Sequence, residues 1–227
     1  MKKSSFVYLR TIVLALGFIL VSLPTLGVAQ SEQKPPTTRP FIPRNIISPK
    51  EVNTLDSFRV TLGRFDKLVI DLNKRRPFPA ETSRLEATAK DLKRRIPLVK
   101  SELQTFIQRV KVRGKWTNEF DSAFEREVTQ MNVAADMKAK FVEWVKQNGG
   151  ARAVITEALS QLGEAAKEID STVGSVKRAQ VPTEYAAAKK RWSWKCWAVG
   201  GLGIVTTVAG CGSCGVGASI YIIDKCL

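Results

Sequence analysis

The sequence predicts an all-α protein: an antiparallel bundle of four or five helices, followed by a disulfide-stapled apolar hairpin or helix at the C-terminal end. Three observations lead to this prediction. Apolar residues recur every three or four positions between Lys50 and Arg191, which is the spacing of amphipathic helices that must pack on one another. The 4 cysteines of the chain all lie within residues 192–227. Residues 196–223 carry no charged side chain.

The composition excludes several classes of enzyme. The chain has 227 residues, a formal net charge of +15 and no histidine, which removes Ser-His-Asp and Cys-His nucleophiles and His-ligated zinc. Carboxylates such as Glu125/Glu127 and Asp66/Asp71 do not share a helix face, so we interpret them as ordinary helix-surface charges. The sequence contains no phosphate loop, Rossmann fingerprint or nucleophile elbow. We therefore expect no enzymatic activity, no cofactor and no metal.

Residues 1–29 have the three-part pattern of a secretory signal. Positive charges precede an uncharged, mostly apolar run at 11–23, and Gly27 and Ala29 place small side chains before a cut at Gln30. The alternative is a retained membrane anchor, because residues 11–29 are uncharged and nearly long enough to span a bilayer. Cleavage is favoured, and it predicts a protein that is secreted or located in the cell envelope.

Residues 30–49 form the second predicted segment, a linker. Residues 30–48 contain four prolines and few apolar residues, which is typical of an extended polyproline-like spacer. The prolines are Pro35, Pro36, Pro40 and Pro43.

Residues 50–191 form the predicted basic helical bundle. The first apolar stripe runs over 55–72, with Thr54 as a candidate cap, and ends at a basic, proline-containing segment. The second stripe runs over 85–110 and predicts a kink or break at Pro97.

Two further stripes complete the bundle. The third covers 116–131, continues over 137–145 after an irregularity and stops at Gly149-Gly150. The fourth is a long, alanine-rich stripe over 154–176. Stripes of this kind bury one face each, so an antiparallel bundle is the economical arrangement.

The excess of 36 Lys and Arg over 21 Asp and Glu admits two interpretations. Nucleic-acid binding is one, and a solvated basic surface that adheres to anionic cell envelopes is the other. Export and the interleaving of acidic with basic residues favour the second. We expect neither a nucleic acid nor a small-molecule substrate as a partner.

Residues 192–227, here called the tail, differ sharply in composition and admit several structures. A transmembrane helix fits the length and a small-residue stripe at i, i+4 spacing, but its flanking positive charges would lie on the outer side. A zinc site or a redox CxxC motif is less favoured, because only Cys211 and Cys214 have the right spacing and no βαβ pattern surrounds them. The third interpretation is a disulfide-stapled, membrane-active peptide.

In this third interpretation the chain folds back at residues 210–215. The turn would place 198–209 against 216–223 and bring Cys196 close to Cys226, with Cys211 and Cys214 as the inner pair. Four cysteines allow three connectivities, and the sequence does not choose between them. The tail's tryptophans alternate with a lysine at one end, which suits a membrane interface. These predicted interface residues are Trp192, Trp194 and Trp197.

The tail resembles the halocin-type bacteriocins. The resemblance rests on Leu202-Gly203-Ile204, on Val208-Ala209-Gly210, on Ser213-Cys214 and on a Gly/aliphatic run that ends at Cys226. It implies a Cys/Gly-rich antimicrobial peptide that is released from the C-terminal end of an exported precursor, whose N-terminal part serves as an immunity or protective domain. Members of that family carry more cysteines than this chain.

Together these features predict an exported precursor whose helical domain shields a membrane-active tail. Its expected partners are a lipid membrane and, for the tail, the chain's own helical domain. One alternative is a non-enzymatic envelope protein anchored by the tail as a helix. Another is an adhesive structural protein without toxic activity.

Overall fold

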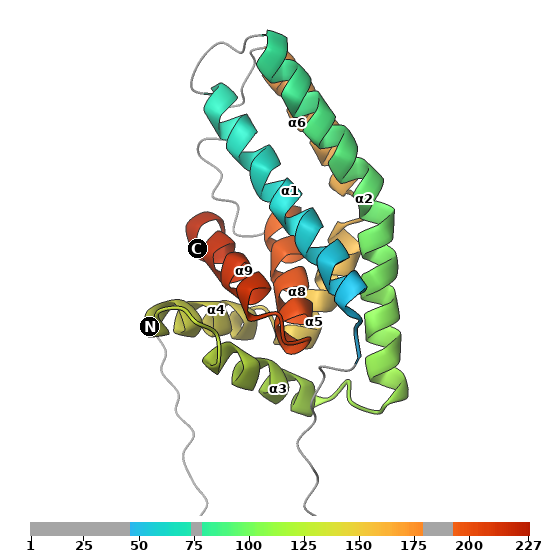
Figure 1. Cartoon of the computed structure of the whole chain (residues 1–227), viewed down its shortest axis with the longest axis vertical. Coiled ribbons are helices and arrows are strands. Elements are labelled where there is room, and N and C mark those ends of the chain that lie inside the picture. The colour runs from blue at the N-terminus through green and yellow to red at the C-terminus, as the bar shows by residue number, and fades with distance from the viewer. Residues whose placement is uncertain (1–45, 74–78, 179–192) are drawn as a thin grey trace, which may run out of the picture. The chain divides into compact units, whose positions relative to one another are not determined.

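The computed structural model describes residues 46–73, 79–178 and 193–227, all of which belong to one compact unit spanning Arg39–Leu227. These residues form eight α-helices and no strand, so the predicted all-α class is confirmed (Figure 1). The predicted signal and most of the predicted linker lie outside the described residues. The helices are α1 (Pro49–Asn73), α2 (Pro79–Val112), α3 (Asn118–Thr129), α4 (Ala135–Gln147), α5 (Ala151–Gln161), α6 (Ala165–Lys177), α8 (Trp194–Val208) and α9 (Gly212–Lys225).

Helix α1 begins with a capping box rather than at Thr54. The backbone N–H of Ser48 donates to Oε2 of Glu51 at 2.6 Å, and the Glu51 N–H donates to the Ser48 hydroxyl at 3.3 Å. Pro49 then takes the first helical position, where its missing N–H has no helical partner to lose. Thr54 lies inside the helix and donates to the carbonyl of Lys50.

Helix α2 passes through Pro97 without a break. Figure 1 shows the helix bending near its middle, which agrees with the predicted kink. Proline has no N–H to donate and its ring crowds the preceding turn, so a bend is the expected local response. The apolar stripe stays on one side, because both Ile96 and Val99 are buried while Leu98 is 56% exposed.

The fourth predicted stripe is two helices instead of one. It divides into α5 and α6 at residues 162–164, where Gly163 donates to the carbonyl of Ser160. At the start of α5, Gly149 and Gly150 have φ of 87° and 91°, which a side chain would strain. The carboxylate of Asp121 then accepts from the Ala151 N–H at 2.8 Å and satisfies the exposed end of the helix. Short turns of this kind give the bundle more helices than predicted.

The core lies where the helices surround α8. Helix α1 packs along α2, and α6 packs on α2. Helix α8 contacts α1, α2, α3 and α5 as well as its hairpin partner α9 (Figure 1). The tail is therefore an internal part of the compact unit and not a separate lobe.

The first prediction concerns the acid sensitivity of the α1 start. Burial by itself would raise the pKa of Glu51, but hydrogen bonds from Arg109 and Ser48 and the charge of Arg109 outweigh it and hold this pKa at about 2 instead of 4.5. A carboxylate with a lowered pKa stabilises the fold above its ordinary pKa, and this contribution is lost as the pH falls from 4.5 toward 2. The difference in urea midpoint between wild type and Glu51→Gln is therefore expected to shrink over that range.

Glu102 provides a control of opposite sign. Burial and the neighbouring charge of Glu51 raise the pKa of Glu102. Its ionised form is therefore disfavoured in the fold, and Glu102→Gln is expected to stabilise the protein slightly near neutral pH. A Glu51→Gln difference that stays constant down to pH 2.5 contradicts the role given to this carboxylate.

Candidate functional site: the buried C-terminal hairpin

The tail is a helical hairpin. Helix α8 ends at a turn in which Gly210 has a φ of 90°, and α9 runs back beside α8 from Gly212. Disulfides join Cys196 to Cys226 and Cys211 to Cys214, with Cα atoms 5.9 and 5.3 Å apart, and no cysteine is free. This is one of the three connectivities that the sequence leaves open. The first disulfide ties the two ends of the hairpin together and the second lies at its turn.

Glycines let the two helices of the hairpin approach closely. A Cβ atom added to Gly203 would lie 2.3 Å from the Cβ of Ala218, and one added to Gly215 would lie 2.2 Å from the hydroxyl oxygen of Thr207. Neither distance is available to real side chains, so these glycines set the spacing between α8 and α9. The predicted small-residue stripe thus packs within the hairpin.

Glycines also let α8 pack closely against the rest of the bundle. A Cβ atom on Gly200 would lie 2.5 Å from the indole of Trp144 in α4, and one on Gly201 would lie 2.5 Å from the Cβ of Ala158 in α5. The backbone of α8 is therefore in direct contact with side chains of the covering helices. Every residue from Cys196 to Val208 is buried.

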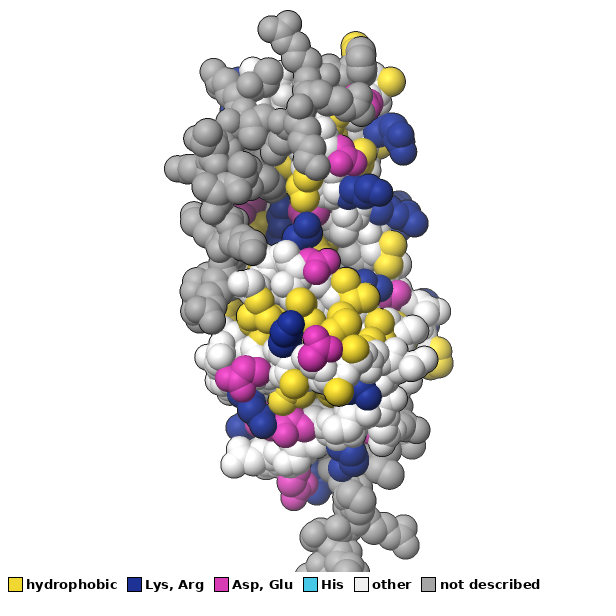
Figure 2. Space-filling view, turned by 90° about the vertical axis from the view of Figure 1, so that its left-hand side faces the viewer, with side chains coloured by type: hydrophobic (Ala, Val, Ile, Leu, Met, Phe, Trp, Pro, Cys, Tyr) yellow, Lys and Arg dark blue, Asp and Glu magenta, His cyan; other side chains and the backbone are white. Residues whose placement is uncertain are grey.

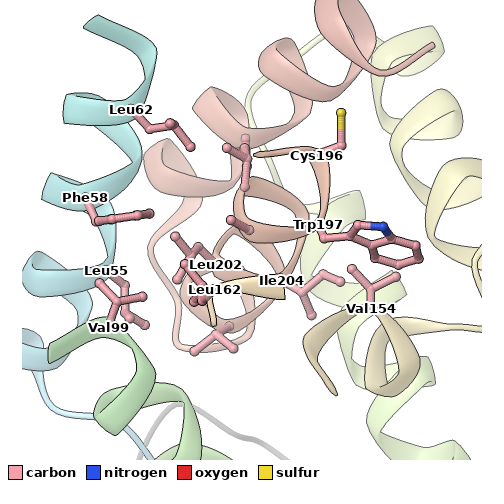
Figure 3. Close-up of a cluster of buried hydrophobic side chains, with 14 of the residues drawn as sticks. Leu55, Phe58, Leu62, Val99, Val154, Leu162, Cys196, Trp197, Leu202 and Ile204 are labelled. Carbon is pink, nitrogen blue, oxygen red and sulfur yellow. The ribbon is translucent and has the colours of Figure 1, made fainter. Parts of the chain in front are cut away.

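Apolar side chains from several helices converge on α8. Phe58 and Leu62 of α1 point toward the side of α8 that carries Leu202, and Val154 of α5 lies next to Trp197 (Figure 3). All five belong to one buried cluster. An apolar surface on all sides of a helix is expected either in a protein core or in a membrane, and here α8 occupies a core.

A buried carboxylate on α1 holds both helices of the tail. Asp66 accepts hydrogen bonds from the ammonium group of Lys195 in α8 and from the hydroxyl of Tyr221 in α9. The side chains of Lys195 and Asp66 are only 13% and 11% exposed. The Lys195 ammonium also lies 5.5 Å from the centre of the Phe65 ring, a cation–π contact. We call Asp66, Lys195 and Tyr221 the tail clamp.

The clamp corrects the interpretation of Asp66 as a surface charge, since only 8% of this residue is exposed. The sequence contains a signal for its position. Asp66 lies four residues after Leu62 and three before Val69, so it shares the buried face of α1. The interpretation of Glu127 as a surface charge is wrong for the same reason, since only 7% of this residue is exposed.

Two of the three predicted interface tryptophans, Trp194 and Trp197, are buried. Trp194 is 2% exposed and Trp197 is 8% exposed, with the Trp197 ring 6.0 Å from that of Trp144. Trp192 lies outside the described residues. A role at a membrane interface for these side chains requires the tail to leave the bundle, and it stays a prediction.

Three further observations concern the alternatives for the tail. Among the residues that the structure describes, no helix has both the length and the apolar character needed to cross a membrane. Residues 194–225 form two helices of 15 and 14 residues instead of one continuous helix. Within the same described ranges, no group of three or more Cys, Asp or Glu side chains is arranged to hold a metal ion.

The chain has no match among protein-family models, curated proteins or solved structures. The likeness of the tail to halocin-type bacteriocins stays a resemblance of residues.

The second prediction distinguishes the two disulfides by what they contribute to stability. Cys196 and Cys226 are 30 positions apart in sequence, and Cys211 and Cys214 are 3 apart. By the chain-entropy model these loops are worth about 3.7 and about 1.6 kcal/mol. Cys196→Ala/Cys226→Ala is therefore expected to lower the free energy of unfolding by about 2 kcal/mol more than Cys211→Ala/Cys214→Ala, measured by guanidinium titration. Equal losses, or a reversed order, contradict the assignment of the outer disulfide as the main staple.

Proposed function

We propose that the chain is the exported precursor of a membrane-active, bacteriocin-like peptide carried by residues 192–227, and that helices α1–α6 cover this tail until it is released. The proposal rests on how the disulfides connect the chain. Both disulfides join cysteines within the tail, and all 4 cysteines are used in them. A cut between α6 and α8 therefore leaves the tail attached to the bundle by non-covalent contacts alone.

The burial of α8 supports a shielding role for the other helices. A free hairpin exposes apolar side chains that α1 and α5 cover in the intact chain, among them Leu202, Ile204 and Val205. Apolar surface is worth about 25 cal/mol for each Å² removed from water, so several hundred Å² provide many kcal/mol for insertion into a membrane. The same surface stays out of water while the bundle is intact.

Buried polar groups without hydrogen-bond partners weaken the contact between the tail and the rest of the bundle. Among the described residues, the indole N–H groups of Trp144 and Trp194 and the hydroxyl of Thr207 are buried without a hydrogen-bond partner. Each such group costs about 1–3 kcal/mol. Trp194 belongs to the tail, and Trp144 packs on Gly200 of the tail. The penalties at these two indoles reduce the net free energy that holds the tail in the bundle, whereas the Thr207 hydroxyl faces Gly215 within the hairpin.

The test uses the whole mature chain, from Gln30, with a protease site inserted at Lys189-Lys190-Arg191, a basic run between α6 and α8 in the sequence. Dye release from lipid vesicles is measured before and after cutting, with the uncut protein and a protease-only sample as controls. The proposal expects leakage only after the cut, and growth inhibition of related cells by the cut material. Reduction of both disulfides before the assay is expected to weaken the leakage, because the hairpin loses its staples.

Two results contradict the proposal. One is a cut sample, and a tail purified from it, that cause neither leakage nor growth inhibition. The other is recovery of the tail only as part of a full-length protein that remains with the membrane fraction, which favours the predicted alternative of an anchored envelope protein.

A further inference from the structure

An open groove separates α1 from α9 on the outside of the bundle. Val60 of α1 and Ile220 and Tyr221 of α9 form its apolar part. A Cβ atom on Gly63 would have nothing within 4 Å, so the α1 side of the groove is open to a ligand. The groove lies on the outer side of the tail, along α9. The other helix of the tail, α8, lies on the inner side.

Basic side chains border the groove. Arg64 and Lys67 are exposed on α1, and Lys225 is exposed at the end of α9. The exposed carboxylate of Asp224 also lines the groove, and the basic side chains outnumber it. No ion pair is formed by these three cations within the described part of the chain. Arg59 differs, because it pairs with Asp56 at 2.7 Å and its guanidinium covers Gly217.

Exposed apolar side chains lie on α9, at Ile220, and just past its end, at Leu227. Ile220 and Leu227 are each 43% exposed, and they are two of the four large apolar residues exposed among the described residues. Figure 2 shows hydrophobic side chains gathered in the middle of the face turned to the viewer, with both basic and acidic side chains among them. Apolar side chains beside exposed cations are the pattern of a surface that lies on a membrane with anionic headgroups.

We propose that the intact protein docks on anionic lipid bilayers through this groove and the exposed face of α9. Lipid phosphates would lie against Arg64, Lys67 and Lys225, while Ile220 and Leu227 would enter the boundary between headgroups and acyl chains. The inference deepens the proposed function and rests on it for the choice of a membrane as partner. Docking precedes release and places the tail at its target before the bundle opens.

The experiment measures co-sedimentation of the uncut mature chain with vesicles of phosphatidylcholine, alone or mixed with phosphatidylglycerol. Arg64→Glu/Lys67→Glu reverses two charges at the groove. The matched control is Arg84→Glu/Lys90→Glu, which reverses two exposed charges on α2, away from α9 (Figure 1). Loss of two attractive charges alone is expected to weaken binding to the mixed vesicles roughly 25-fold, at about fivefold per charge. The control is expected to lose much less.

Three outcomes overturn the inference: equal binding to both vesicle types, equal losses in the groove and control variants, or undiminished binding of Ile220→Ser/Leu227→Ser. Circular dichroism of each variant checks that it is folded. Failure here is distinct from failure of the proposed function, because the docking assay uses only uncut protein. A chain that does not dock but causes leakage after cutting refutes the docking surface alone.

Discussion

Replacing Gly203 with valine is expected to lower the free energy of unfolding by at least about 3 kcal/mol. The Cβ atom alone would lie 2.3 Å from the Cβ of Ala218 and 3.7 Å from the Phe141 ring. Both neighbours are buried, so the hairpin helices must separate to accept the new side chain. Guanidinium denaturation followed by tryptophan fluorescence measures the loss.

The matched control for this change is Gly63→Ala on α1. A Cβ atom there meets nothing within 4 Å, and the residue lies inside a helix. Alanine is therefore expected to raise the free energy of unfolding by about 0.5–1 kcal/mol, because glycine loses more backbone entropy on folding. If Gly203→Val is tolerated as well as Gly63→Ala, α8 and α9 do not approach each other as closely as described.

Loss of the Asp66 carboxylate is expected to destabilise the protein by about 3–5 kcal/mol, because it breaks a buried ion pair by removing one partner of the Lys195 ammonium. Asp66→Ala also removes an acceptor of the Tyr221 hydroxyl. The effect is measured as the shift in guanidinium midpoint. Amide hydrogen exchange in α8 and α9 is expected to accelerate in this variant more than exchange in α2, which the clamp does not touch.

A triple variant separates the clamp from simple packing. Asp66→Leu/Lys195→Met/Tyr221→Phe removes every charged or polar member together, so no buried charge is left without a partner. It is expected to recover most of the stability that Asp66→Ala loses, since buried ion pairs replaced by apolar side chains are often neutral or better. If Asp66→Ala unfolds at the wild-type midpoint, Asp66 does not hold the tail.

Helix positions were predictable where an amphipathic pattern is strong. Residues 55–72 and 85–110 show the 3–4 spacing, and both stripes are buried along α1 and α2. The hairpin was predictable from the glycines near Cys211 and from the position of Cys196 relative to Cys226. The division at Gly163 was missed because Leu162 and Ala165 are both buried, so the apolar stripe continues across the turn.

The location of α8 was not predictable from its own residues. A helix that is apolar on all sides is equally suited to a lipid bilayer and to a protein interior, and the choice depends on which surfaces the other helices offer. The partners of Asp66 were also hidden, since Lys195 and Tyr221 lie 129 and 155 residues away in sequence. The only signal in the sequence for the inward position of the Asp66 carboxylate is that it lies on the apolar face of α1.

The most direct test of the precursor account is the intact mass of the material that the producing cell exports. The account predicts a separate tail fragment that begins within residues 179–195, with four hydrogen atoms fewer than its reduced form because both disulfides are closed. It also predicts a bundle fragment that contains no cysteine. Finding only the uncut chain, with residues 192–227 still attached in both the medium and the membrane fraction, contradicts the account.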